Sequence, residues 1–132
     1  MEDTRVTFET AKLAKEKGFF QETNRLEIPY YNYKGEFKGD VSDWRIRKYI
    51  RGEDTSDIEF VSAPTQSLLA KWLREQHNIY VTSQIGNLDF INTYHYEIRY
   101  IDKNKFKCKV KGNFKTYEEA YEIGLQEALK LI

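Results

Sequence analysis

The sequence predicts an α+β fold in which an antiparallel sheet packs on helices. Apolar residues recur with helical spacing over 64–77 and 116–132, and three segments between them alternate like strands, at 79–82, 90–101 and 106–114. The C-terminal order is therefore α-β-β-β-α with a three-stranded meander, and extra short strands are possible nearer the N-terminus. A length of 132 residues with only 7 glycines and 2 prolines suits one ordered domain.

We expect this single domain, residues 1–132, to have three parts: an N-terminal helix within 1–18, an irregular strand and loop segment at 19–62, and the α-β-β-β-α core at 63–132. Thr7 is placed to cap the N-terminal helix over 8–17, because a threonine side chain accepts a hydrogen bond from the first turn. Gly18 is placed to end it in the left-handed conformation.

Residues 19–60 have the weakest pattern in the chain. Two Lys-Gly pairs, at 34–35 and 38–39, are typical of turns between short strands. Tyrosines gather in the 29–51 region, which makes it one candidate contact surface.

The core helices carry clearer signals. Pro64 suits the first residue of one helix, since proline needs no hydrogen-bonded N–H there. Thr116 and Glu119 have the spacing of a capping box at the start of the other. Gly124 lies within the apolar face of that last helix, and we expect it to allow a close approach to the sheet.

The last two strands have their apolar residues at even-numbered positions. If both sets face the helices, the connecting loop must hold an odd number of residues, or a bulge must intervene. We predict a three-residue loop at 103–105. This places Phe106, Cys108 and Val110 on the covered face and the alternating lysines on the outer face.

The 21 basic and 21 acidic side chains cancel, so the formal net charge is zero. This excludes a protein that binds its partner through a uniform charge over its whole surface. Locally the charges separate. Residues 79–115 hold seven basic and three acidic side chains, whereas 116–132 hold one basic and four acidic ones. The strands are basic and the last helix is acidic.

The candidate binding residues are the basic and aromatic side chains of the strands: Arg99, Lys107, Lys109, Lys111, Arg45, Arg47, Tyr49 and Arg51. The first four are expected to share the outer face of the hairpin with His95 and Glu97. Such a row contacts phosphates, and an aromatic ring such as Tyr49 stacks on bases. The alternative is a solvated face whose lysines protect an edge strand from unwanted pairing.

Catalytic and metal sites are not predicted. Cys108 is expected to be a buried, inert thiol, and as the single cysteine it excludes an internal disulfide. His95 and Glu97 lie two residues apart, but no further His or Cys cluster completes a metal site. We found no glycine-rich phosphate loop and no serine nucleophile elbow. We therefore expect no enzyme activity and no cofactor.

The chain also lacks any run of 18 apolar residues, and its first residues do not have the layout of a signal peptide. A single cysteine suits a reducing compartment. We expect a cytoplasmic protein without membrane contact.

Two parts of the core resemble small uncharacterised proteins of phages and prophages from Bacteroides-type gut bacteria. They are Ala63-Pro64-Thr65 through Trp72-Leu73-Arg74-Glu75 with His77-Asn78-Ile79, and Thr116-Tyr117-Glu118-Glu119-Ala120 through Gly124-Leu125-Gln126-Glu127-Ala128-Leu129. Residues 10–19 are similar as well. The resemblance implies a mobile-element origin and no known activity.

A second, local resemblance covers Tyr96-Glu97-Ile98-Arg99-Tyr100 with Asp102, then Phe114-Lys115-Thr116 and Glu119-Ala120. It is similar to the arm-binding domain of phage-type tyrosine recombinases, which is three strands and a helix and lays its sheet on DNA. The resemblance implies that Arg99, Lys107, Lys109 and Lys111 contact DNA, although no recombinase catalytic domain follows. The element order also resembles the double-stranded RNA-binding domain, but Glu118 and Glu119 replace its basic helix start.

The sequence thus predicts a small non-catalytic binding protein of phage or mobile-element origin. It contacts a protein partner through the tyrosine-rich 29–51 region or an open sheet face. The alternative is DNA binding through the basic outer face of the sheet.

Overall fold

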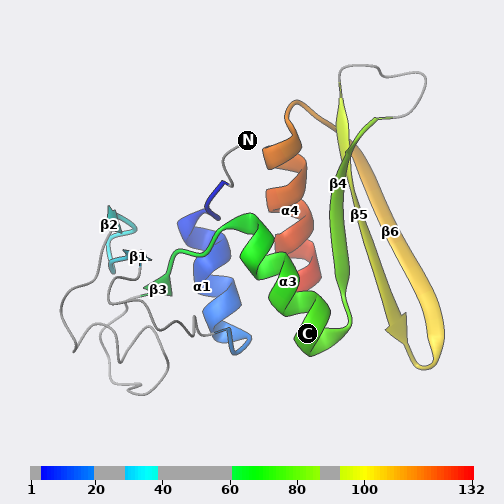
Figure 1. Cartoon of the computed structure of the whole chain (residues 1–132), viewed down its shortest axis with the longest axis horizontal. Helices are drawn as coiled ribbons and strands as arrows, with labels where there is room; N and C mark the ends of the chain where they lie inside the picture. Colours follow the sequence, from blue (N-terminus) through cyan, green and yellow to red (C-terminus); the bar gives the residue numbers. More distant parts are fainter. Residues whose placement is uncertain (1–3, 20–28, 39–60, 87–92) are drawn as a thin grey trace. The chain divides into compact units, whose positions relative to one another are not determined.

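A computed structural model describes residues 4–19, 29–38, 61–86 and 93–132. The chain divides into two compact units, with residues 1–4 and 66–132 in unit 1 and residues 5–65 in unit 2. The described residues form three helices and two three-stranded antiparallel sheets (Figure 1). The predicted α+β class is confirmed, and the single domain over the whole chain stays a prediction.

Unit 2 contains the N-terminal helix α1, Phe8–Glu16. The Thr7 side chain accepts the N–H of Thr10, as expected of the capping residue. Gly18 follows with a φ of 94°, in the left-handed region where a side chain is disfavoured. The predicted start and stop of this helix are confirmed.

The small sheet of unit 2 has the order β2-β1-β3. Its strands are β1 (Tyr30–Tyr31), β2 (Phe37–Lys38) and β3 (Val61–Ser62). The predicted turn at 34–35 joins β1 to β2: the Gly35 N–H donates to the Asn32 carbonyl at 2.9 Å, and Gly35 has a φ of 80°. The other predicted turn, at 38–39, lies partly outside the described residues.

Unit 1 has the predicted order α-β-β-β-α. Its elements are α3 (Gln66–His77), β4 (Tyr80–Ile85), β5 (Tyr94–Asp102), β6 (Lys105–Phe114) and α4 (Tyr117–Leu129). The helix α3 begins two residues after Pro64, the predicted first residue. The sheet order is β4-β5-β6, so β5 is the central strand and β6 lies at an edge.

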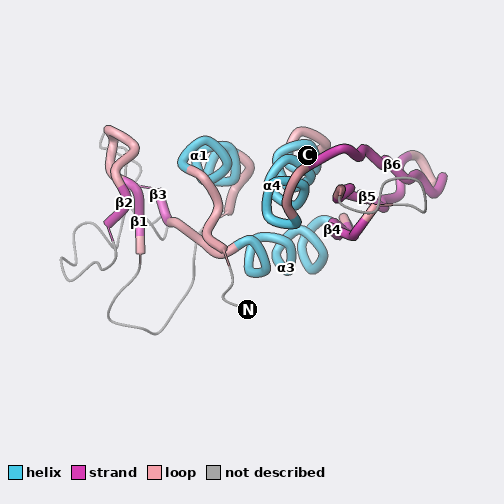
Figure 2. The backbone as a smooth tube through the Cα atoms, turned by 90° about the horizontal axis from the view of Figure 1, so that it is seen from above, coloured by secondary structure: helices cyan, strands magenta, loops and turns pink. Residues whose placement is uncertain are grey.

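The helix α4 lies along one face of this sheet, against β4 and β5, with α3 beside it (Figure 2). An ideal Cβ on Gly124 would lie 2.8 Å from the Cβ of Tyr96, closer than real Cβ contacts. This confirms that Gly124 permits a close approach to the sheet. The core between these elements is fully buried and consists chiefly of Leu69, Leu73, Ile98, Leu125 and Leu129.

Polar groups also connect the two helices of unit 1. The buried amide of Gln66 donates to the Glu118 carbonyl at 2.9 Å and to a carboxylate oxygen of Glu122 at 3.1 Å. At the start of α4, the Thr116 hydroxyl accepts the Glu119 N–H at 3.0 Å. The Glu119 carboxylate accepts the N–H of Lys115, one residue before the position expected in a capping box.

The predicted three-residue loop between β5 and β6 is wrong. Asp102 pairs with Lys105, so the loop holds two residues, Lys103 and Asn104, with φ of 50° and 65°. Two residues with positive φ form the turn that best matches the twist of a hairpin. An even loop puts even-numbered residues of one strand opposite odd-numbered residues of the other, and the two apolar sets fall on opposite faces.

A bulge corrects this register near the other end of the hairpin. Tyr96 pairs with Lys111 and Tyr94 with Phe114, so Gly112 and Asn113 together oppose the single residue His95. Asn113 has a φ of 70°. Beyond the bulge Phe114 returns to the helix side, where its ring lies 5.9 Å from that of Tyr96.

Candidate binding surface

We call the face of the β4-β5-β6 sheet opposite α4 the outer face. Its members are Tyr80, Thr82, Gln84, His95, Glu97, Arg99, Ile101, Phe106, Cys108, Val110 and Gly112. Three of its apolar side chains are largely exposed, Ile101 at 67%, Phe106 at 70% and Val110 at 60%. Ile98, on the covered face of the same hairpin, is 0% exposed. Within the described part of unit 1, the outer face thus carries exposed apolar side chains beside polar and charged ones.

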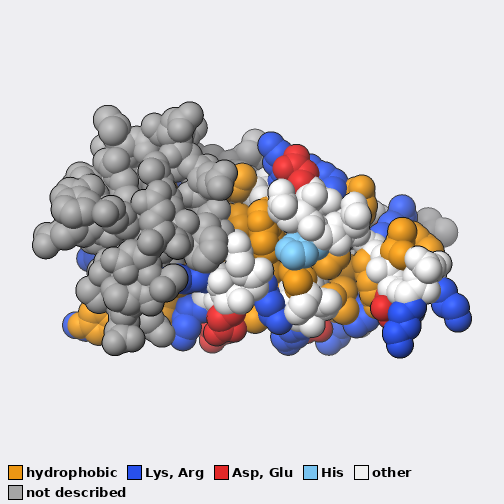
Figure 3. Space-filling model, turned by 90° about the horizontal axis from the view of Figure 1, so that it is seen from below, with side chains coloured by type: hydrophobic (Ala, Val, Ile, Leu, Met, Phe, Trp, Pro, Cys, Tyr) orange, Lys and Arg blue, Asp and Glu red, His pale blue; other side chains and the backbone are white. Residues whose placement is uncertain are grey.

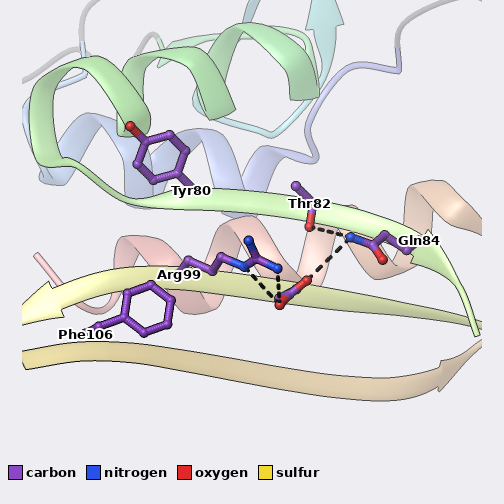
Figure 4. A pocket seen from close by; sticks show the side chains of 6 residues that line it. Tyr80, Thr82, Gln84, Arg99 and Phe106 are labelled. Carbon is purple, nitrogen blue, oxygen red and sulfur yellow. Dashed lines mark hydrogen bonds and ion pairs between the residues drawn. The ribbon is translucent and has the colours of Figure 1, made fainter. Parts of the chain in front are cut away.

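Glu97 is at the centre of a hydrogen-bonded group on this face (Figure 4). One carboxylate oxygen accepts from Nε of Arg99 at 3.0 Å and from the Cys108 thiol at 3.3 Å. The other accepts from the amide of Gln84 at 3.4 Å, and the same amide lies 3.4 Å from the Thr82 hydroxyl. Three strands therefore hold one carboxylate in place.

This arrangement changes the protonation equilibria of two groups. The hydrogen bond from Arg99, followed by that from Cys108, lowers the pKa of Glu97 below its usual value. The hydrogen bond to Glu97 raises the pKa of the Cys108 thiol. The predicted burial of Cys108 is wrong: this residue is exposed on the outer face because of the two-residue loop. A raised pKa favours the protonated thiol, which is the less nucleophilic form, although the residue is exposed.

We predict that Glu97→Gln makes the Cys108 thiol react severalfold faster with a disulfide reagent near neutral pH. The neutral amide no longer disfavours the thiolate, so the pKa of the thiol falls. The measurement is the pseudo-first-order rate against pH for the native protein and the variant. Asp102→Asn, on the same strand but without contact to Cys108, should leave the rate unchanged; equal rates for all three proteins contradict the prediction.

Two hollows interrupt the outer face. The first, of about 410 Å³, lies over the Glu97–Arg99 pair between the rings of Tyr80 and Phe106 (Figure 4). The second, of about 390 Å³, lies over the bulge and is lined in part by His95, Val110 and Gly112. Both are open to solvent, and each has room for side chains of a partner molecule.

The predicted basic face is not assembled as expected. Lys107, Lys109 and Lys111 pair with Tyr100, Ile98 and Tyr96, so they point to the helix side of the sheet while Arg99 points to the outer face. The expectation that these four share one face is wrong, and its cause is the even loop.

The lysines form an exposed row along the edge strand β6. Lys107 forms an ion pair with Asp102 at 3.4 Å. Blue lysine and arginine side chains border orange apolar ones near the end of the β5-β6 hairpin (Figure 3). The other predicted binding residues, Arg45, Arg47, Tyr49 and Arg51, lie outside the described residues.

The sequence reasoning missed Tyr80, Phe106 and Val110 as surface residues. A signal was present in Gly112-Asn113, since glycine and asparagine adopt the positive φ that bulges often need. In residues 4–19, 29–38, 61–86 and 93–132, no group of three or more His, Cys, Asp or Glu is arranged to hold a metal ion. Within these same ranges, no helix has the length and apolar character needed to span a bilayer.

No protein-family model matches the chain, and neither a curated protein nor a solved structure matches it.

Proposed function

We propose that the protein is a non-catalytic binding protein that contacts another protein through the outer face of the β4-β5-β6 sheet. The observation that carries this proposal is the exposure of Ile101, Phe106 and Val110 together on one face of one hairpin. Ile101 and Phe106 are directly opposed in the hairpin, and Val110 follows four residues further along β6. Exposed single apolar residues are ordinary, but several on one face of a sheet are typical of an interaction surface.

The chemistry of the face favours a protein partner. Phe106 and Tyr80 are aromatic residues of the kind that dominate protein interfaces, and Arg99 lies between them with its side chain 58% exposed (Figure 4). The central carboxylate of Glu97 disfavours the phosphates of a nucleic acid on this face. The open hollows provide places for partner side chains.

The proposed setting is the cytoplasm of a cell that carries a phage or a related mobile element. The exposed, free thiol of Cys108 supports a reducing compartment. The mobile-element origin is supported by the resemblance of residues 63–79 and 116–129 to small phage and prophage proteins.

The test is a pull-down from an extract of the producing cells with matched variants. Phe106→Ser with Val110→Ser should reduce the affinity for the captured protein about 30-fold, as expected for removal of an interface hot spot. The control is Lys109→Ser with Lys111→Ser, at neighbouring positions of β6 that point to the other face. Equal recovery by both double variants contradicts the proposal.

A second candidate function is nucleic-acid binding, and one observation favours it. Residues 103–115 hold six lysines and no acidic residue. Five of the six belong to the hairpin loop or β6, and those on β6 are exposed. Lysines in a row neutralise successive phosphates and release counterions.

For this candidate, Lys107→Gln, Lys109→Gln and Lys111→Gln together should weaken binding to labelled duplex DNA. The slope of log affinity against log salt should fall by about 0.9 for each phosphate that the variant no longer neutralises. Arg99→Gln should have no comparable effect, because Arg99 points to the opposite face. If the native protein does not bind duplex DNA at low salt, nucleic-acid binding is rejected. That result does not affect the proposed binding of a protein partner.

A further inference from the structure

We infer that the partner of the outer face is a second copy of this chain, stacked face to face about a two-fold axis. The inference rests on the proposed function, since it names the partner of the same surface. The axis lies between the two sheets, runs across the strands and passes over the pair Ile98–Lys109. The outer face is self-complementary about this axis on each of its three strands.

The central strand supplies complementary charges. Glu97 and Arg99 lie on either side of Ile98 along β5. An axis at Ile98 exchanges their positions, so Arg99 of each copy lies over Glu97 of the other. The guanidinium has five N–H donors and a side chain that is 58% exposed, so it can bind the partner carboxylate in addition to its own. In a two-fold interface this pair occurs twice.

The edge strand β6 supplies a knob and a hole. Phe106 lies three residues before Lys109 and Gly112 three residues after it, so the same axis exchanges them. Each is roughly 10 Å from the axis along the strand. Phe106 is 70% exposed, whereas Gly112 has no side chain and lies under the 390 Å³ hollow. The ring of each copy therefore fits over the hollow of the other.

The strand β4 is compatible with the same axis. Val81 pairs with Ile98, so the axis exchanges Tyr80 with Thr82 and places a large side chain over a smaller one. Each strand thus contributes one kind of matched pair between the two copies. The pairs are opposite charges on β5, an aromatic ring over a hollow on β6, and a large side chain over a smaller one on β4.

The area of the outer face limits how tightly two copies can associate through it. A strand of nine residues is about 30 Å long and three strands are about 14 Å wide, so the face covers about 400 Å² in projection. Stable complexes bury about 800 Å² per partner. We therefore expect a reversible dimer whose population depends on concentration, with the two sheets aligned within about 30°.

Charge reversal in two separate variants provides the decisive experiment. Glu97→Arg alone and Arg99→Glu alone each place like charges over one another, and each should weaken self-association at least tenfold in sedimentation equilibrium. An equimolar mixture of the two variants restores both opposite-charge pairs and should associate with nearly native affinity. Lys109→Glu reverses a charge on the other face of the hairpin and should leave self-association unchanged.

A second variant tests the knob and hole without altering charge. An ideal Cβ on Gly112 meets only the Cβ of His95, at an ordinary 3.5 Å, so Gly112→Leu fills the hollow with little strain in one copy. It should abolish self-association while circular dichroism stays native.

A native protein that remains monomeric at its highest soluble concentration overturns the inference. So does a mixture of the two charge variants that fails to associate although the native protein does. Neither result rejects the proposed function, which is contradicted when the Phe106 and Val110 variant and its lysine control recover a protein partner equally.

Discussion

Ile98→Ala is expected to lower the free energy of unfolding by about 2 to 5 kcal/mol. Ile98 is at the centre of β5, is 0% exposed and faces α4, so truncation removes buried apolar surface and leaves a cavity. Urea denaturation followed by circular dichroism measures the change.

Ile101→Ala is the matched control, because it is the same substitution in the same strand. Ile101 is 67% exposed on the outer face, so we expect a change below about 1 kcal/mol, chiefly from strand propensity. Equal losses for the two variants contradict the assignment of Ile98 to the covered face and Ile101 to the outer face.

Gly124→Val is expected to destabilise unit 1 by about 1 to 3 kcal/mol, as overpacked cores do. The new Cβ would lie 2.8 Å from the Cβ of Tyr96 and 3.2 Å from a methyl carbon of Val81. Because these distances are too short, α4 must move away from the sheet. Gly124→Ala should also destabilise, although alanine favours the helix by about 1 kcal/mol over glycine.

Gly112→Ala is the control for this prediction. Its Cβ makes only an ordinary 3.5 Å contact with His95, and the position does not have a positive φ. Thermal unfolding should therefore show a Gly112→Ala midpoint close to that of the native protein and a lower midpoint for Gly124→Ala. A Gly124→Ala protein more stable than the native one contradicts the close approach of α4 to the sheet.

The elements that depend on local signals were predictable from the sequence. Thr7, Gly18 and Thr116 act through hydrogen bonds or backbone conformations within a few residues, so their roles follow from residue type and position. Gly124 was predictable for a similar reason, since a glycine in an apolar helix face has few other uses.

The orientation of β6 was not predictable in the same way. It depends on whether the loop after Asp102 holds two or three residues, and a change of one residue moves every side chain to the other face. The two-residue loop leaves Phe106 and Val110 exposed, and local patterning does not reveal which loop length the chain adopts. The lysines of β6 are exposed as expected, but they lie on the helix side of the sheet. The candidate site is therefore the outer face and not the lysine row.

The most direct test of the outer face as a protein-binding surface is site-specific photo-crosslinking in the producing cells. A benzoylphenylalanine residue replaces Phe106 in one variant and Lys109 in another, so the reactive group lies on opposite faces of the same strand. We predict a discrete protein adduct from position 106, either with a second copy or with another protein, and none from position 109. An adduct from position 109 alone contradicts the account.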